Sequence, residues 1–148
     1  LEVWSMALRV FSDYPIIGVG PDNFTLIAPQ YANPGQVIRV THNTYLQILS
    51  EEGLLGFSFF FLLIISSVLG LSRLLRKYCK KDDPLSWQIL TVGMSLAGVL
   101  ICCIFQNKAN HEFLYWPMAA AAVLEKISVN RSLQDNQNMK ISVSQTAS

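Results

Sequence analysis

The sequence predicts an all-α membrane protein, a polytopic helical bundle fragment with an extracytoplasmic helical loop region. Hydrophobic residues make up 51% of the 148-residue chain, charged residues only 14%, and the mean hydropathy is +0.35. This composition is too apolar for an ordinary soluble domain. Two long stretches carry no charged residue, and the loop between them is rich in lysine and arginine. These observations together indicate helices that cross a bilayer.

Three stretches are candidates for membrane spans. The uncharged stretch 54–72, LLGFSFFFLLIISSVLGLS, has the length that a helix rising about 1.5 Å per residue needs to cross a hydrocarbon core of about 30 Å. The stretch 85–107 is also uncharged and contains small residues through which membrane helices pack closely. The stretch 113–126 is shorter and holds Pro117, so we expect a third span whose charged end snorkels, with an interfacial or re-entrant helix as the alternative.

Basic residues predict the orientation. The linker between the first two spans holds five of the eleven basic residues, Arg73, Arg76, Lys77, Lys80 and Lys81. Because short basic loops stay in the cytoplasm, residues 1–53 are expected outside the membrane. The tail 127–148 is rich in Ser, Asn and Gln, so we expect it to be disordered in the cytoplasm. The chain starts in a helical pattern, so we expect the C-terminal part of a longer protein, inactive by itself.

The outer region 1–53 is expected to hold short helices and turns. Apolar residues recur at helical spacing near its start, at Leu1, Trp4, Leu8 and Phe11. Such a helix lies on a membrane surface or packs on other helices, and we expect packing. The segment DYPIIGVGPDNF follows and predicts a compact turn in which Gly18 and Gly20 allow positive φ. It lacks the third glycine of a dinucleotide-binding loop.

The stretch 41–56, THNTYLQILSEEGLLG, predicts a polar helix that opens into the first span. Thr41 or Asn43 is the expected N-cap of this helix. A capping box formed by Thr44 and Gln47 is the alternative, and Gly53 is the expected end of the helix. The positive end of the helix dipole disfavours an imidazolium, so we expect a neutral His42, as a general base must be. Free N–H groups of the same turn would suit an anion such as phosphate. The plainer interpretation is a polar residue near a helix start.

Several other chemistries are excluded. The acidic residues and the two histidines lack the spacing of metal ligands, so no metal and no other cofactor is expected. A formal net charge of +1 with no basic groove argues against nucleic acid as a partner. The three cysteines are not placed as a disulfide framework. The lipid bilayer is the partner that the composition predicts.

Two segments together resemble a known family. DYPIIGVGPDNF followed by THNTYLQILSEEGLLGF closely resembles the C-terminal region of the O-antigen ligase and O-antigen polymerase family, glycosyltransferases of the bacterial inner membrane. His42 and Asn43, followed by Gly53 and Gly56, look like the family's histidine-asparagine to paired-glycine motif. The resemblance covers about residues 2–124 and is specific at this motif.

The resemblance implies an activity and a site. The family's ligase moves a glycan from undecaprenyl diphosphate onto a sugar of the lipid A core on the periplasmic side, a step of lipopolysaccharide biosynthesis that uses neither nucleotide nor metal. His42 is the implied catalytic base. We expect Arg39 and Asn43 to bind the diphosphate or a sugar, with Arg9 as a more distant candidate. The motif glycines are expected to be structural: Gly18, Gly20, Gly53 and Gly56.

Other functions compete with the ligase. An O-antigen polymerase or an enzyme that transfers glycan to a protein hydroxyl would use the same donor. A non-catalytic transporter-like protein is the alternative from another class. Transporters place ionisable groups near the middle of the membrane, and the stretches 54–72 and 85–107 have none. We therefore favour the transferase.

Overall fold

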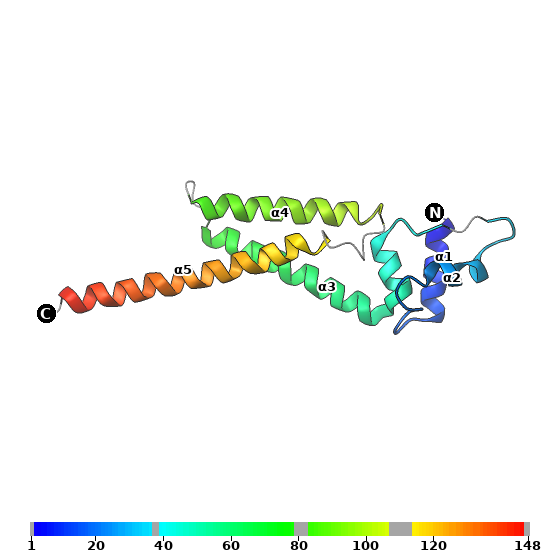
Figure 1. Cartoon of the computed structure of the whole chain (residues 1–148), viewed down its shortest axis with the longest axis horizontal. Helices are drawn as coiled ribbons and strands as arrows, with labels where there is room; N and C mark the ends of the chain where they lie inside the picture. Colours follow the sequence, from blue (N-terminus) through cyan, green and yellow to red (C-terminus); the bar gives the residue numbers. More distant parts are fainter. Residues whose placement is uncertain (1, 37–38, 79–82, 107–113, 147–148) are drawn as a thin grey trace.

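The computed structural model describes residues 2–36, 39–78, 83–106 and 114–146, and this part of the chain contains helices and no strand. The elements are α1 (Glu2–Asp13), α2 (Phe24–Ile27), the short 3-10 helix η1 (Ala28–Tyr31), α3 (Thr44–Tyr78), α4 (Pro84–Cys102) and α5 (Trp116–Thr146). In Figure 1, α3, α4 and the first part of α5 lie side by side, and α1 and α2 gather at one end. The all-α prediction is confirmed.

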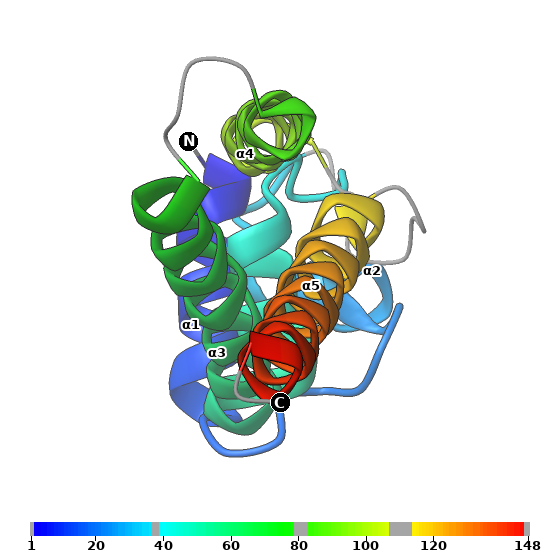
Figure 2. The same ribbon diagram turned by 90° about the vertical axis from the view of Figure 1, so that its left-hand side faces the viewer.

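A common apolar core joins α3, α4 and α5. Its fully buried members include Ile89 of α4 and Leu114, which precedes α5 (each 0% exposed). Figure 2 looks along the bundle and shows the three helices around this core. α4 starts at Pro84 because proline suits a first helical turn, and the carboxylate of the N-cap residue Asp83 accepts the N–H of Leu85 at 3.0 Å.

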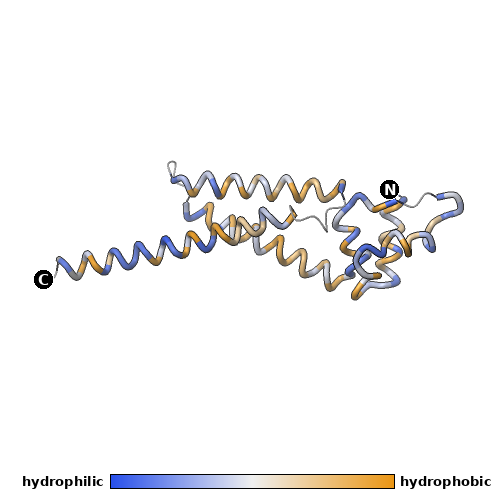
Figure 3. Tube along the Cα trace, viewed as in Figure 1, coloured by the Kyte–Doolittle hydropathy of each residue, from blue (hydrophilic) through white to orange (hydrophobic). Residues whose placement is uncertain are grey.

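Within the described residues, α3 and α4 are the two helices long and apolar enough to cross a membrane. Their surfaces carry exposed large apolar side chains such as Phe59 (67% exposed) and Met94 (69%). Figure 3 shows hydrophobic stretches, coloured orange, along both helices. An apolar surface of this extent fits lipid and not water. The predicted span 54–72 lies within α3, and α4 ends at Cys102, earlier than the predicted residue 107, which lies outside the described residues.

The structure describes the third predicted span only in part. Residue 113 lies outside the described residues, α5 starts at Trp116, and this helix is not among the two candidate spans. It nevertheless packs against both α3 and α4. The tail predicted to be disordered continues α5 as a helix to Thr146, and Figure 1 shows it extending beyond the bundle. No Pro or Gly follows Pro117 in α5, so a helix nucleated by its packed first turns can propagate, since each added residue adds one hydrogen bond.

The first helix packs by a different face from the one predicted. Met6, Ala7 and Val10 are buried against Phe24 and neighbouring residues, whereas Leu8 is 49% exposed. These buried positions also have helical spacing, and the apolar residues of the sequence do not distinguish the two faces. Packing on other helices, the expected role of this segment, holds because α1 contacts α3.

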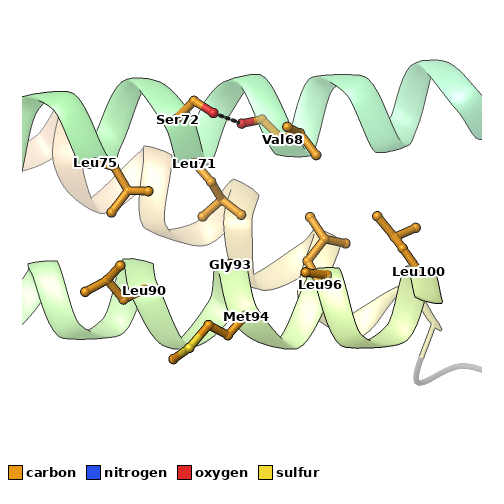
Figure 4. Close-up of a pocket in the computed structure, with 10 residues that line it drawn as sticks. Val68, Leu71, Ser72, Leu75, Leu90, Gly93, Met94, Leu96 and Leu100 are labelled. Carbon is orange, nitrogen blue, oxygen red and sulfur yellow. Dashed lines mark hydrogen bonds between the residues drawn. The ribbon is translucent and has the colours of Figure 1, made fainter. Parts of the chain in front are cut away.

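An apolar pocket of about 390 Å³ separates parts of α3 and α4. Figure 4 shows leucines of both helices facing it, among them Leu71 and Leu75 of α3 and Leu90 and Leu100 of α4. Gly93 of α4 also lines the pocket, and a Cβ atom at this glycine would meet no atom within 4 Å. The two helices are therefore not tightly packed along this stretch.

A break at Gly53 divides α3 into two helical segments. Gly53 has φ 65° and ψ −164°, which is not helical, so residues 44–52 and 54–78 run in different directions. The predicted helix end at Gly53 is confirmed, but the chain enters the next helix immediately. Such a break leaves carbonyl groups before it and N–H groups after it without intrahelical partners.

The segment 15–20 supplies those missing partners. The N–H groups of Val19 and Gly20 donate to the carbonyl oxygens of Ser50 and Glu51, at 3.1 and 2.7 Å. On the other side of the break, the N–H groups of Leu54 and Leu55 donate to the carbonyl oxygens of Pro15 and Ile16, at 2.8 and 3.1 Å. We call this set of contacts between residues 15–20 and 50–55 the backbone clamp.

Glycine is required on both sides of the backbone clamp. Gly18 has φ +65°, and a Cβ atom there would lie 2.3 Å from the backbone carbon of Glu51. A Cβ atom at Gly53 would lie 2.5 Å from the backbone carbon and oxygen of Ile16. Any side chain would thus push one backbone away from the other. Gly20 also has a positive φ, and Gly56 follows the break inside the helix.

The carboxylate of Glu51 links the backbone clamp to α2. Glu51 is only 5% exposed, its Oε1 accepts the N–H of Phe24 at 3.2 Å, and its Oε2 accepts from Nε2 of Gln47 at 3.2 Å. Burial raises the pKa of Glu51, which precedes the predicted membrane span 54–72, and the N–H donors partly offset this effect. The Oε1 atom of Gln47 is buried and has no partner among the described residues.

Replacing Gly53 or Gly18 by alanine should destabilise the protein by about 2 to 3 kcal/mol, because the new Cβ atom meets backbone and φ is positive. Thermal unfolding of the purified chain in detergent, followed by circular dichroism, measures the effect. Gly98→Ala is the matched control, since a Cβ atom at Gly98 meets nothing within 4 Å and alanine favours a helix. Equal unfolding midpoints for all three variants would contradict the backbone clamp.

Replacing Glu51 should separate its hydrogen bonds from its charge. Glu51→Ala leaves the buried N–H of Phe24 without an acceptor and should cost about 1 to 3 kcal/mol. Glu51→Gln keeps that acceptor, and its amide can donate to the unpartnered oxygen of Gln47, so its stability should stay within about 1 kcal/mol of the wild type. Chemical unfolding in detergent compares the two variants, and equal losses would reject this role of the side chain.

Candidate functional site

His42 lies in the loop that enters α3 and exposes its side chain. Its φ of 47° is unusual for a residue with a side chain, although histidine is among the residues that adopt it most readily. The neighbours Thr41 and Asn43 are 2% and 7% exposed. The loop therefore buries the residues on both sides of His42 and turns the imidazole outward.

Hydrogen bonds hold this loop in place. Nε1 of Trp4 donates to the carbonyl oxygen of Thr41 at 2.9 Å, and Oγ1 of Thr41 donates to the carbonyl oxygen of Asn43 at 3.1 Å. Oδ1 of Asn43 accepts the N–H of Leu46 at 3.0 Å, so Asn43 is the N-cap of α3. One of the two predicted caps is thereby confirmed.

The start of α3 is docked on the end of α4. The N–H of Thr44 donates to the carbonyl oxygen of Cys103 at 2.8 Å, and Oγ1 of Thr44 donates to that of Gln106 at 2.6 Å. Oη of Tyr45 donates to the carbonyl oxygen of Leu100 at 2.9 Å. Carbonyl groups at a helix end have no intrahelical partners, so these bonds satisfy them. They also fix His42 beside the end of a membrane helix.

The predicted anion site at the start of α3 is corrected by these contacts. Of the first-turn N–H groups, that of Thr44 bonds to Cys103 and that of Leu46 bonds to Asn43. They are not free to receive a phosphate. Occupation of these two N–H groups favours side chains as the partners of a negatively charged ligand near His42.

Arg39 is the side chain that the structure brings to His42. A pocket of about 270 Å³ is lined by Val3, Trp4, Arg39, Val40, Thr41, His42 and Phe105. Arg39 and His42 are both exposed, so a ligand in this pocket can reach an imidazole and a guanidinium together. Asn43, predicted as a ligand, is not among the lining residues and serves as the helix cap. Arg9 lies on α1 and is not among them either.

Two aromatic residues that line the pocket were not predicted from the sequence. Trp4 comes from α1 and Phe105 from the turn after α4, and both lie far from His42 in the sequence. The sequence pattern places Trp4 on one face of a helix and Phe105 in the predicted span 85–107, and neither pattern links the residue to His42. Their place beside His42 depends on the packing of α1 and α4, which no local pattern predicts. Among the described residues, no three His, Cys, Asp or Glu side chains gather as metal ligands.

The His42 pocket and the basic residues near the end of α3 lie at opposite ends of the bundle. Figure 1 places the start of α3 and the end of α4 near the α1 and α2 region, whereas the end of α3 and the start of α4 lie at the far end. Arg73, Arg76 and Lys77 belong to that far end.

A family model described as O-antigen ligase matches residues 1–61. Comparison with curated proteins and with solved structures found no match. The matched segment contains the backbone clamp and the loop that carries His42, and it ends within the membrane part of α3. Residues 1–61 of this chain, with their helix break and exposed histidine, are therefore similar to the O-antigen ligase family.

Proposed function

We propose that the chain provides the base-bearing part of a membrane glycosyltransferase site of the O-antigen ligase type. The donor is a glycan linked to undecaprenyl diphosphate, and the acceptor is a sugar hydroxyl, such as one of the lipid A core. The observation that supports this proposal best is the pocket shared by His42 and Arg39 at the end of α4. A base and a cation in one pocket suit transfer from a diphosphate.

His42 acts as the general base in this reaction. A sugar hydroxyl is a weak nucleophile until a base accepts its proton. The hydroxyl oxygen forms a bond to the anomeric carbon of the donor as its proton passes to the imidazole, and the bond from that carbon to the diphosphate oxygen breaks. The exposed position of His42, with buried neighbours on both sides, leaves the ring accessible to such a hydroxyl.

Arg39 stabilises the leaving diphosphate. Negative charge grows on the diphosphate as its bond to the sugar breaks, and a guanidinium can donate two parallel hydrogen bonds to phosphate oxygens. The N–H groups of Thr44 and Leu46 at the start of α3 are occupied, which favours the arginine for this role. Trp4 and Phe105 offer apolar walls on which a sugar ring can rest.

We place this site on the periplasmic side of the bacterial inner membrane. Short loops rich in lysine and arginine stay in the cytoplasm, and the end of α3 that carries Arg73, Arg76 and Lys77 lies opposite the His42 pocket. The lipid-linked donor would meet His42 at the outer membrane border. This position also supports a substrate with one end in lipid and the other in water.

His42→Asn should lower glycan transfer at least about 100-fold, because asparagine adopts a positive φ readily but cannot accept the proton. Transfer is measured in membranes that contain the protein, with a lipid-diphosphate glycan donor and a glycan acceptor. His42→Ala is the second variant, and membrane levels of both variants are compared with the wild type. Retained transfer by His42→Asn at normal protein levels would reject the role of base.

Arg39→Ala should lower transfer about 10- to 100-fold through loss of charged hydrogen bonds to the diphosphate. Arg9→Ala is the matched control, since Arg9 is an exposed arginine outside the pocket, and it should leave transfer unchanged. The same membrane assay compares the two variants. Equal effects of both substitutions would show that general positive charge, and not this pocket, matters.

A further inference from the structure

A second polar pocket lies at the other end of the bundle, where α3 ends and α4 begins. It measures about 320 Å³ and is lined by Lys77, Tyr78, Asp83, Arg131, Ser132 and Asp135. These residues come from the last turn of α3, the N-cap of α4 and the middle of α5. The pocket therefore sits at the border between the apolar parts of these helices and water, the level at which lipid headgroups lie.

Two cations converge in this pocket on one aromatic ring. Nζ of Lys77 lies 5.1 Å from the ring centre of Tyr78, and the guanidinium carbon of Arg131 lies 5.8 Å from it. Nζ of Lys77 also donates to Oγ of Ser132 at 2.6 Å. The lysine lines the same pocket as the arginine, and its ammonium can donate to a phosphate.

The two acidic residues of the pocket differ in their partners. Asp83 forms an ion pair with Arg131, 3.0 Å between Nη1 and Oδ2, and its Oδ1 accepts the N–H of Leu85. Within the described part of the chain, no ion pair joins Asp135 or Lys77 to another residue. The pocket therefore offers one positive and one negative group that form no ion pair with another described residue.

The order of these two groups follows the order of charges in a phospholipid headgroup. Lys77 is level with Ser132 through their hydrogen bond. Asp135 lies one turn further along α5, about 4.5 Å at 1.5 Å per residue, in the direction in which α5 leaves the bundle in Figure 1. A phospholipid with an ethanolamine headgroup has its phosphate next to the glycerol and its ammonium further out.

We propose that this pocket binds an ethanolamine phospholipid. The phosphate binds Lys77, next to the ion pair of Arg131 with Asp83, and the ammonium donates hydrogen bonds to the carboxylate of Asp135. A choline headgroup has no N–H to donate to Asp135, and a glycerol headgroup has no cation for it. The inference depends on the membrane position of α3 and α4 and is independent of the transfer reaction at His42.

Native mass spectrometry of the whole chain in detergent tests this assignment. The protein is mixed with equal amounts of ethanolamine, choline and glycerol phospholipids that share the same acyl chains. The wild type should retain the ethanolamine lipid about fivefold better than the choline lipid, the effect of one hydrogen bond to Asp135 that choline cannot donate. Equal retention of all three lipids, or preference for the glycerol lipid, would overturn the assignment.

Variants identify the groups that contact the lipid. Asp135→Asn should abolish the preference for ethanolamine over choline, and Lys77→Gln should weaken all three lipids because each carries the phosphate. Lys140→Gln is the control, an exposed lysine of α5 outside the pocket, and it should change nothing. Circular dichroism checks that each variant remains helical, and Asp135→Asn alone decides the outcome if Lys77→Gln does not fold. An unchanged preference in Asp135→Asn would reject the proposal.

Discussion

Backbone hydrogen bonds between the segment 15–20 and the break in α3 hold the outer part of this protein together. The break at Gly53 exposes carbonyl and N–H groups next to the apolar segment 54–72, where water is scarce and an unpaired backbone group is costly. The segment 15–20 pairs with groups on both sides of the break. This pairing allows α3 to change direction at the membrane border without leaving those groups unpaired.

The position of the candidate site follows from that change of direction. Residues 44–52 turn away from the line of the membrane segment, and their first turn meets the end of α4, where Thr44 and Tyr45 bond to carbonyl groups. The same arrangement buries Asn43 as a cap and leaves His42 exposed. An imidazole at the membrane border is thus a consequence of how two helix ends satisfy each other's backbone groups.

Local signals in the sequence predicted much of this structure. An uncharged stretch predicted the membrane part of α3, a positive-φ residue predicted the break at Gly53, and a short polar side chain predicted the cap at Asn43. Each of these features depends on residues within one or two turns of the chain. Arg39 was predicted beside His42 for the same reason, since three residues separate them in the sequence.

Features that depend on distant contacts were not predictable in this way. The buried face of α1, the presence of Trp4 and Phe105 in the His42 pocket and the use of the N–H of Thr44 by Cys103 all require knowledge of which helices meet. The tail from residue 127 to 146 is helical and not disordered, and the reason for this difference from the prediction is another one. Its polar composition suggested disorder, but composition does not show that a packed helix start can extend through it.

Amide hydrogen exchange of the whole chain in detergent micelles tests the backbone clamp most directly. The amides of Val19 and Gly20 belong to a loop segment by sequence, but their hydrogen bonds to the carbonyl groups of Ser50 and Glu51 predict slow exchange, like that of helical amides in α3. Exchange of Val19 and Gly20 at the rate of an open loop, with α3 still protected, would contradict the proposed basis of the fold.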